Sequence, residues 1–247
     1  MDSGILSLLD VSFSYPGSGQ VVDGLTFHFG EGEFACLLGA NGSGKSTILK
    51  LSCGILTPEN GIVKLWNKPL NEYRGRDKAK LLSYMPQNLH LIAPFRVREV
   101  VEMGLYPYDI PPLLTVDDAI GMVGLSDKKE VAIGNLSGGE RRRAFIAMTL
   151  VQGAGILLMD EPLANLDIRY QVEIIKLLRD IKGVTTAMAL HDINLAFRFD
   201  AVVLIQKGRI LAKGTPEEVI TEELLQEAFD VKLKLMRHGP QTFISYQ

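Results

Sequence analysis

The feature that most constrains this chain is the glycine-rich segment Gly39–Thr47, which reads GANGSGKST. It follows the apolar run Phe34–Leu38 and leads into the apolar segment Ser46–Leu56, so we expect a strand, a loop and a helix in that order. The pattern Gly-x-x-x-x-Gly-Lys-Ser/Thr between a strand and a helix is typical of loops that wrap a phosphate group. The alternative is a glycine-rich turn with a lysine by chance, and the flanking strand and helix argue against it.

The residue types in this loop suit a nucleotide triphosphate and its cation. Glycines let consecutive backbone N–H groups curl around a phosphate, and the helix N-terminus adds a partial positive charge. We expect Lys45 to reach the β- and γ-phosphates and Ser46 to give its hydroxyl to Mg²⁺. The predicted nucleotide contacts of this segment are Gly39, Asn41, Gly42, Ser43, Gly44, Lys45, Ser46 and Thr47.

A second signal is the pair of acids that ends the apolar run Ile156–Met159. Four consecutive apolar residues suit a strand buried on both faces, and ligands bind at the carboxyl ends of strands in open α/β sheets. Two adjacent buried acids would be costly without a cation. We therefore expect Asp160 to face Mg²⁺, directly or through water, and Glu161 to polarise the attacking water as general base. The alternative is a strand that ends in two exposed acids.

His191 directly follows another apolar strand, Thr186–Leu190. A single histidine is more often structural than catalytic, but this one is expected at the same sheet edge as Gly39 and Asp160. We therefore expect His191 to hydrogen-bond the γ-phosphate and to hold the attacking water in line.

The segment Leu136–Glu140, LSGGE, predicts a second anion site. Ser137 and Glu140 have the spacing of a capping box, which begins a helix. Gly138 and Gly139 leave the backbone N–H groups at that helix N-terminus open to an anion. A helix cap alone would explain the spacing, and only the other elements around it favour the functional interpretation.

The chain is organised as one α/β domain with an inserted helical lobe. Alternating apolar residues in Leu6–Tyr15 and Val21–Phe29 predict half-buried strands. Helical periodicity replaces this pattern between residues 88 and 152, and the α/β pattern then resumes. We therefore expect a single domain over 1–247, with a core of 1–87 and 153–247 and a helical subdomain of 88–152. Its predicted helices are Val97–Gly104, Thr115–Val123 and Gly139–Val151.

Composition excludes two classes of function. The formal net charge is −3, with no basic excess of the kind that a nucleic-acid binder usually shows. The dense basic triplet Arg141–Arg143 is interpreted as a solvated helix face. No apolar run approaches the roughly 20 residues that span a bilayer. Cys36 and Cys53 are expected to pack as small apolar residues.

In its order of motifs the chain resembles the ABC ATPases. The matching elements are the phosphate loop, Gln87, the LSGGE segment, the MDE acids, Asp167 and His191. The resemblance implies a P-loop NTPase (RecA-like) core, an antiparallel β region and a helical subdomain. It also implies a head-to-tail homodimer in which each Mg·ATP lies between the phosphate loop of one chain and the LSGGE segment of the other.

The resemblance also implies roles for individual residues. Tyr15 matches the aromatic residue that stacks on adenine. Gln87 matches the loop that senses Mg²⁺ and touches the membrane partner, and Asp167 matches the loop that crosses the dimer interface. The predicted catalytic residues are Glu161, His191, Lys45 and Gln87; the predicted metal ligands are Ser46, Gln87 and Asp160; and Ser137, Gly138, Gly139, Glu140 and Asp167 join the nucleotide contacts. The chain departs from the family at Arg142, often Gln, and at Leu163, often Ser or Thr.

Within the family, three stretches are similar to the cassettes of iron-siderophore, haem and cobalamin importers: Pro94–Val101, Met103–Tyr108 and His191–Ala196. This similarity implies permease subunits as partners, an extracytoplasmic binding protein indirectly, and a peripheral position on the cytoplasmic face of the membrane. Cassettes for zinc, manganese or molybdate are near neighbours. Three rival classes are an ABC ATPase of DNA repair or translation, a GTPase or kinase, and an inactive structural cassette. The intact motif set and the absence of a coiled coil or a second cassette argue against these three classes.

Overall fold

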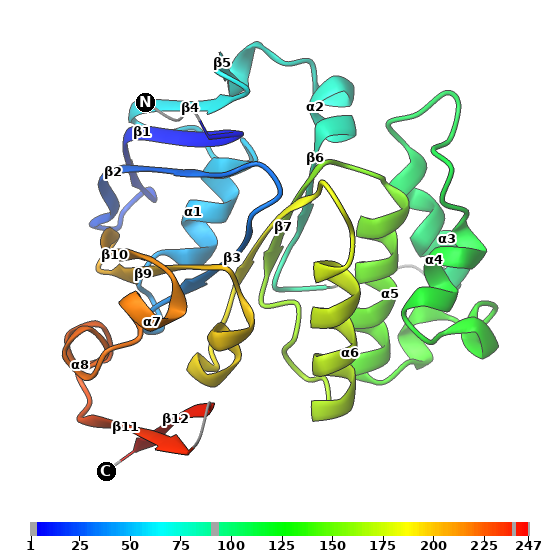
Figure 1. Cartoon of the computed structure of the whole chain (residues 1–247). Coiled ribbons are helices and arrows are strands. Elements are labelled where there is room, and N and C mark those ends of the chain that lie inside the picture. Colours follow the sequence, from blue (N-terminus) through cyan, green and yellow to red (C-terminus); the bar gives the residue numbers. More distant parts are fainter. Residues whose placement is uncertain (1–3, 90–93, 239–240, 247) are drawn as a thin grey trace. The chain divides into compact units, whose positions relative to one another are not determined.

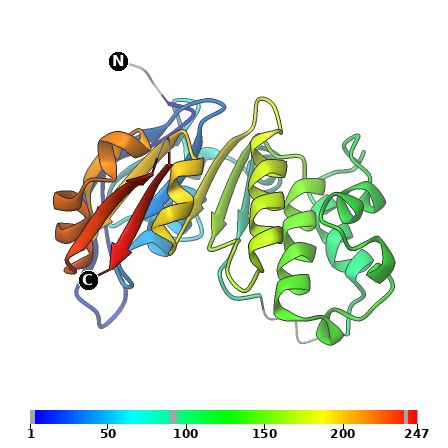
Figure 2. The ribbon, with the colours of Figure 1, turned by 60° about the horizontal axis from the view of Figure 1, so that its bottom comes forward.

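The computed structural model describes residues 4–89, 94–238 and 241–246 of the chain. These residues form two compact units, shown from two directions in Figures 1 and 2. The first unit contains Met1–Glu72 and Ala187–Gln247, and the second contains Tyr73–Thr186.

The first unit contains an antiparallel sheet with the strand order β2-β1-β4-β5. Its strands are β1 (Leu6–Ser14), β2 (Gln20–Phe29), β4 (Asn60–Leu65) and β5 (Lys68–Pro69). Along β2 the buried side chains are those of Val22, Leu25, Phe27 and Phe29, whereas most of the residues between them are exposed. The two half-buried strands expected from the alternation are therefore confirmed.

The first unit also contains a buried strand, β3 (Phe34–Leu38), whose five residues are all buried. It pairs in parallel with β9 (Ala201–Gln206), which forms a hairpin with β10 (Arg209–Gly214). On its other side lies β8 (Thr185–Ala189), the strand at which the chain passes from one unit to the other. The α/β class expected from the sequence is confirmed by this parallel sheet.

The helix after the glycine-rich loop is shorter than expected. It is α1 (Lys45–Ser52), not a helix to Leu56. Gly54 adopts a positive φ of 69°, and the amides of Ile55 and Leu56 both return to the carbonyl oxygen of Lys50. A left-handed glycine that lets later amides bond back to the last turn is a common way for a helix to end.

In the last part of the first unit, the residues Thr215-Pro216-Glu217-Glu218 predict the start of a helix, and the elements after it were not expected from the sequence. A capping box begins α7 (Pro216–Val219), and α8 (Glu222–Phe229) follows. The antiparallel pair β11 (Leu233–His238) and β12 (Gln241–Tyr246) comes next. The amide of Ile244 on β12 donates to the side-chain oxygen of Asn194, which belongs to the 3-10 helix Ile193–Arg198.

The second unit is built on two parallel strands, β6 (Leu82–Met85) and β7 (Ile156–Asp160). Its helices are α2 (Gly75–Leu81), α3 (Val97–Glu102), α4 (Val116–Met122), α5 (Gly138–Val151) and α6 (Ile168–Arg179). Helices α3 and α4 pack on α5, and α5 and α6 lie side by side in both views (Figures 1 and 2). The inserted lobe 88–152 remains a prediction, because the compact unit that holds α3 to α5 also includes β6, β7 and α6.

The basic triplet is not a solvated helix face, so that interpretation was wrong. Arg142 is 6% exposed and Arg143 4% exposed, while Arg141 is half-buried. The physical reason is that α5 packs on most of its sides, and both buried guanidinium groups donate to main-chain carbonyl oxygens. Arg143 bonds Val123 and Gly124 at 2.7 and 2.9 Å and stacks on the Tyr170 ring at 3.7 Å.

Both cysteines are buried free thiols, as expected for small packed apolar residues. Burial raises the pKa of the Cys36 thiol far above its ordinary value. Among the described residues, none of the helices combines the length and apolar character needed to cross a bilayer.

Candidate functional site

The glycine-rich loop joins β3 to α1 through backbone that only glycine adopts easily. Gly39 has a φ of 155°, and a Cβ there would lie 2.3 Å from the carbonyl oxygen of Ile205 and 2.6 Å from the Ser43 hydroxyl. Side chains are therefore excluded where the loop leaves the strand. Asn41 and Gly42 lie exposed at the tip of the loop.

Lys45 lies back across the loop at the first residue of α1. Its Nζ donates to the carbonyl oxygens of Gly39 and Ala40, at 2.7 and 3.2 Å, and the residue is only 5% exposed. Gly44 is the N-cap of α1, and Ser46 follows, half-buried. A buried ammonium therefore stands at the positive end of a helix dipole, an arrangement that favours an anion.

The buried hydroxyl of Ser43 tests whether this loop fits a polyphosphate. Its oxygen has no hydrogen-bond partner among the residues that the structure describes. A buried hydroxyl without a partner is uncommon in native proteins and calls for an explanation. A phosphate oxygen in the loop would supply an acceptor, so the donors of this loop fit the phosphates of a nucleotide.

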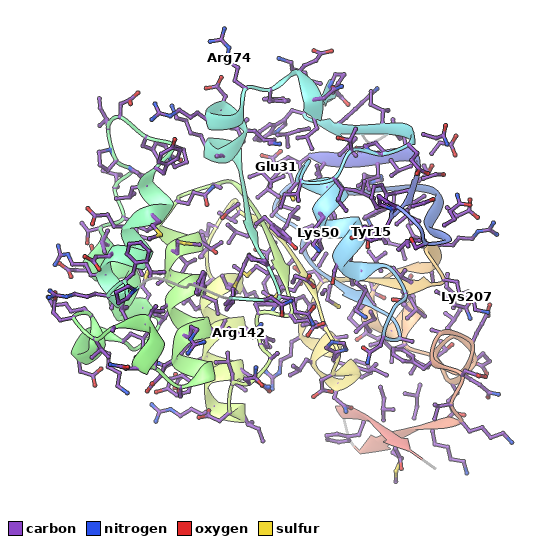
Figure 3. All side chains as sticks on the ribbon, turned by 180° about the vertical axis from the view of Figure 1, so that it is seen from behind. Tyr15, Glu31, Lys50, Arg74, Arg142 and Lys207 are labelled. Carbon is purple, nitrogen blue, oxygen red and sulfur yellow. The ribbon has the colours of Figure 1, made fainter. Side chains whose placement is uncertain are left out.

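Tyr15 follows β1 and lies beside α1 (Figure 3). Its hydroxyl is 3.3 Å from the Thr47 hydroxyl, and its ring packs edge-on against Phe13 with centroids 5.0 Å apart. The half-buried ring is therefore fixed next to the first turn of α1. Its partner Thr47 lies two residues after Lys45.

His191 lies beside the start of the same loop. The amide of Leu190 donates to the carbonyl oxygen of Leu37 at 3.0 Å. His191 directly follows Leu190, and Gly39 lies two residues after Leu37. The side chain of Asp192 caps the following 3-10 helix at Asn194. His191 is exposed. The first unit therefore brings Tyr15, the phosphate loop and His191 together.

In the second unit, Gln87 and the acid pair follow neighbouring strands. The last ladder pair of β6 and β7 is Met85 with Met159. Asp160 ends β7 and is 1% exposed, and Glu161 follows it with a φ of 54°. A positive φ is uncommon for a residue with a side chain, so the Glu161 backbone is held in place by its surroundings. Gln87 is exposed.

Arg142, which the sequence marked only as a departure from the pattern of the ABC ATPases, joins these two segments. Its guanidinium donates to the carbonyl oxygen of Glu161 and, at 3.2 Å, to the carbonyl oxygen of Gln87. Burial lowers the pKa of Arg142, and the negative charges of Glu161 and Asp160 oppose that shift. Figure 3 labels Arg142 on α5. An arginine within a basic triplet gave no signal for this contact.

The predicted capping box of the LSGGE segment is confirmed. The Ser137 hydroxyl accepts the amide of Glu140 at 3.2 Å, and the Glu140 carboxylate accepts the amide of Ser137 at 3.0 Å. Lys128 also bonds the Glu140 carboxylate. The Lys128 side chain and then the Ser137 amide hold the pKa of Glu140 below its ordinary value. Ser137 and Gly138 are exposed at the N-terminus of α5.

The first turn of α5 packs against the loop that precedes α6. A Cβ at Gly139 would lie 2.8 Å from the carbonyl oxygen of Asn165, so the two backbones approach closely. Asp167 caps α6 by accepting the amide of Tyr170 at 3.0 Å. The second unit thus brings the LSGGE segment close to the loop of Asp167, and Gln87 close to Glu161 through Arg142.

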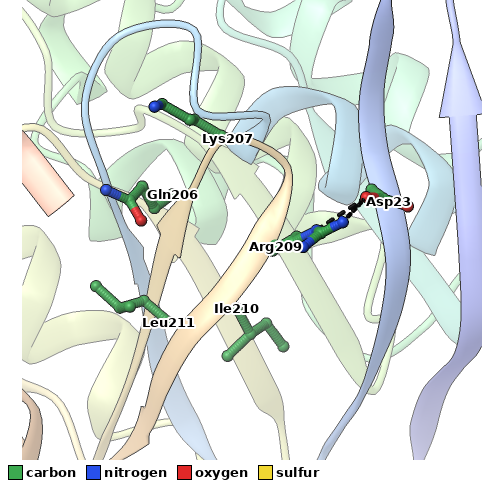
Figure 4. A pocket seen from close by; sticks show the side chains of 6 residues that line it. All are labelled: Asp23, Gln206, Lys207, Arg209, Ile210 and Leu211. Carbon is green, nitrogen blue, oxygen red and sulfur yellow. Dashed lines mark hydrogen bonds and ion pairs between the residues drawn. The ribbon is translucent and has the colours of Figure 1, made fainter. Parts of the chain in front are cut away.

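The turn between β9 and β10 also supports the glycine-rich loop, which the sequence alone did not show. The amide of Gly208 donates to the carbonyl oxygen of Ser43 at 2.9 Å, and the amide of Asp23 donates to the Gly208 carbonyl oxygen at 3.2 Å. Arg209 pairs with the Asp23 carboxylate beside a surface pocket (Figure 4). The Lys207-Gly208 pair between two strands indicated the turn but not its partner.

Comparisons with known proteins place this chain in a family. The sequence profile of the ABC transporter family matches residues 22–164. The chain is 38% identical over 244 residues to the hemin import ATP-binding protein HmuV of Rhodopseudomonas palustris, covering 94% of this chain and 90% of that protein. It is 33% identical over 233 residues to the ferric enterobactin transport ATP-binding protein FepC of Escherichia coli K12, covering 89% and 85%.

Among solved structures, the chain is similar in fold to the ATP-binding cassette MJ0796, a dimer in a post-hydrolysis state with ADP and Pi. That likeness has a TM-score of 0.77 at 23% identity and covers 85% of this chain and 98% of the other. The P-loop NTPase fold expected from the sequence is therefore confirmed. The chain belongs to the ATP-binding cassettes of the ABC transporter family, which are ATPases.

Proposed function

We propose that this chain is the ATP-hydrolysing subunit of an importer for an iron-siderophore, haem, cobalamin or a similar metal chelate. The observation that carries the ATPase assignment is the buried ammonium of Lys45, which lies across the glycine-rich loop at the N-terminus of α1. The names of two relatives, a hemin importer and a ferric enterobactin transporter, support the cargo class.

The residues of the first unit would bind ATP. Tyr15 would stack on the adenine ring, and the backbone of Gly39–Thr47 would surround the phosphates. The ammonium of Lys45 would exchange the carbonyl oxygens of Gly39 and Ala40 for the β- and γ-phosphates. The exposed His191 would bond the γ-phosphate from the neighbouring strand end.

The residues of the second unit would supply the general base. Gln87 and Asp160 of this unit would be Mg²⁺ ligands, and in the first unit Ser46 is the proposed Mg²⁺ ligand; the cation supplies charge neutralisation of the phosphates when bound. The half-buried Glu161 would accept a proton from the attacking water, a role typically worth about 10²–10⁴-fold in rate.

A second copy of this chain would complete each site. Ser137, Gly138, Gly139 and Glu140 would bind the γ-phosphate held by the partner's loop, and Asp167 would line the interface. The exposed N-terminus of α5 supports this role, because the exposed residues Ser137 and Gly138 leave the helix N-terminus accessible to an anion.

The membrane partner would bind around Gln87 and the segment Ala93–Pro112, of which Ala93 lies outside the described residues. Exposed apolar side chains gather in and just after this segment: Met103, Tyr106, Ile110 and Leu113. Single exposed apolar residues are common, but a group of them indicates a contact surface. Such a partner would place the chain on the cytoplasmic face of the membrane, with an extracytoplasmic binding protein reached only through the permease. The net charge of −3 does not favour nucleic acid.

Growth tests can decide the cargo. A strain that lacks this gene should lose growth on ferric siderophores, hemin or cobalamin as limiting nutrient, and the wild-type gene should restore it. A Lys45→Ala gene should not restore growth. A defect limited to zinc, manganese or molybdate starvation would instead favour a cassette for one of those ions, and no defect in any medium would contradict the transport role.

Crosslinking tests the membrane partner. A cysteine at the exposed Ile110 should capture a permease subunit, whereas a cysteine at Glu223 on α8, also exposed, should not. Capture from Glu223 alone would show that the partner binds the other unit.

A further inference from the structure

The guanidinium of Arg142 joins two main-chain segments that are far apart in the sequence. It donates to the carbonyl oxygens of Gln87 and Glu161 from its position on α5. Its side chain is almost entirely buried. Burying an arginine is costly unless its charge and its donors are matched, so its contacts with both carbonyl oxygens are expected to be structurally important.

These contacts extend the link between β6 and β7 beyond the sheet. The ladder ends at Met85 and Met159, and Gln87 and Glu161 each lie two residues further along. Beyond this last ladder pair, the Arg142 side chain bonds both segments. The planar guanidinium suits the task because its donors have a fixed geometry, whereas a lysine ammonium is a single point.

The Glu161 backbone adopts an unfavourable conformation at the point where Arg142 bonds it. Its positive φ is unfavourable for a residue with a side chain, and its carbonyl oxygen also accepts the amide of Ala164 at 3.2 Å. The direction of the Glu161 carboxylate follows from this backbone. A misplacement of about 1 Å at a reacting group can cost about a hundredfold in rate.

We propose that Arg142 is a positioning residue that fixes the Glu161 backbone against the Gln87 segment, so that a displacement of Gln87 moves the carboxylate of Glu161. This inference rests on the proposed function, because it takes Glu161 as the group that activates water. In this proposal Arg142 acts through the Glu161 backbone and is not itself a catalytic group.

Substitutions at Arg142 and its neighbour test the proposal. Arg142→Met removes the charge and the donors, and Arg142→Lys keeps the charge but loses the planar pair of donors. Arg143→Met is the matched control, because Arg143 is equally buried on the same helix and bonds carbonyl oxygens elsewhere, at Val123 and Gly124.

We expect Arg142→Met and Arg142→Lys to lower kcat by about tenfold to about a hundredfold and to leave KM for ATP unchanged. Arg143→Met should lower the melting temperature by about as much as Arg142→Met does, because both remove an equally buried arginine. It should nevertheless keep the wild-type kcat. Amide hydrogen exchange gives a readout that does not need activity. Exchange should rise near both Gln87 and Glu161 in Arg142→Met, and near neither of them in Arg143→Met.

Two results would overturn the proposal. One is wild-type kcat in Arg142→Lys, which would show that charge alone matters. The other is unchanged exchange near Gln87 and Glu161 in Arg142→Met. If the wild-type chain itself hydrolyses no ATP, the proposed function fails, and the exchange measurement still decides the role of Arg142.

Discussion

The amide of Gly208 donates a hydrogen bond to the carbonyl oxygen of Ser43 at 2.9 Å, which ties the turn between β9 and β10 to the glycine-rich loop. Gly208 has a φ of 76°, and a Cβ there would lie 2.1 Å from the carbonyl oxygen of Val21. The backbone of Gly208 therefore supports the glycine-rich loop, at a position where a side chain does not fit.

We expect Gly208→Ala to destabilise the chain and to weaken ATP binding. The matched control is Gly17→Ala, because Gly17 has the same φ of 76° and open space around its Cβ position. The control should lose about 1–2 kcal/mol of unfolding free energy from the backbone conformation alone. Gly208→Ala should lose clearly more, since the Val21 backbone must also move. Denaturant unfolding and ATP titration measure both effects. Equal losses in the two variants would show that the turn does not support the loop.

Lys45→Ala should abolish tight ATP binding. A hydrogen bond to a charged group is worth about 1.5–3 kcal/mol, so the loss of the ammonium should raise the Kd by at least about tenfold. The control is Lys50→Ala, a lysine further along α1 (Figure 3). Nucleotide titration of the two variants checks the prediction, and an unchanged Kd in Lys45→Ala would contradict the nucleotide assignment.

The lowered pKa of Glu140 predicts a direction for acid sensitivity. A carboxyl group whose pKa is lower in the folded state than in the unfolded state stabilises the fold. This contribution is fully present above the unfolded pKa of about 4.3, and it is lost as the pH falls through the folded pKa. The hydrogen bond from Lys128 is the largest cause of the shift. Lys128→Met should therefore raise the pKa of Glu140 toward its ordinary value.

Carboxyl NMR titration of Glu140 checks this expectation. Lys129→Met is the control, because Lys129 pairs with Asp117 instead. If the pKa of Glu140 is the same in the wild type and in Lys128→Met, the helix cap at Ser137 alone sets that pKa.

Local motifs made much of this protein predictable from its sequence. The loop Gly39–Thr47, the buried strand before Asp160 and the capping box at Ser137 each follow from the spacing of a few residues. The phosphate loop could be placed because its glycines are required by the backbone itself. The sequence also predicts a hairpin of Ala201–Ile205 and Arg209–Lys213 across Lys207-Gly208, and the structure confirms it.

The remaining features depend on contacts between distant segments, which spacing does not reveal. Arg142 lies in a basic triplet whose pattern suggested solvent, yet its donors go to carbonyl oxygens from two other segments. The hairpin β11–β12 was not expected from the sequence, and Asn194 from a remote 3-10 helix bonds it at Ile244. Helix α1 ended early because Gly54 takes a left-handed conformation, which a glycine permits but does not require.

A shared site between two chains makes a further prediction. Ser137 is exposed, so Ser137→Arg should leave ATP binding by the single chain intact. The long charged side chain should block ATP-driven dimerisation of the Glu161→Gln form, because it would occupy the space of the partner's γ-phosphate. Light scattering or analytical ultracentrifugation with and without ATP measures this effect.

Thr115→Arg is the control for loss of a helix cap. Thr115 is also an exposed N-cap residue, and its hydroxyl accepts the amide of Asp118. Thr115→Arg in the Glu161→Gln background should still dimerise with ATP. An equally tight ATP-dependent dimer in the Ser137→Arg form would rule out the shared site.

We expect this chain to hydrolyse ATP with Glu161 as the general base. The direct test is steady-state turnover and ATP affinity of Glu161→Gln beside Glu102→Gln, an exposed acid at the end of α3. The amide keeps the shape of the side chain but cannot accept a proton. We expect Glu161→Gln to bind ATP as tightly as the wild type and to lose at least about 10²-fold in kcat, with no loss in Glu102→Gln. Turnover of Glu161→Gln near the wild-type rate would show that another group activates the water and would contradict the account.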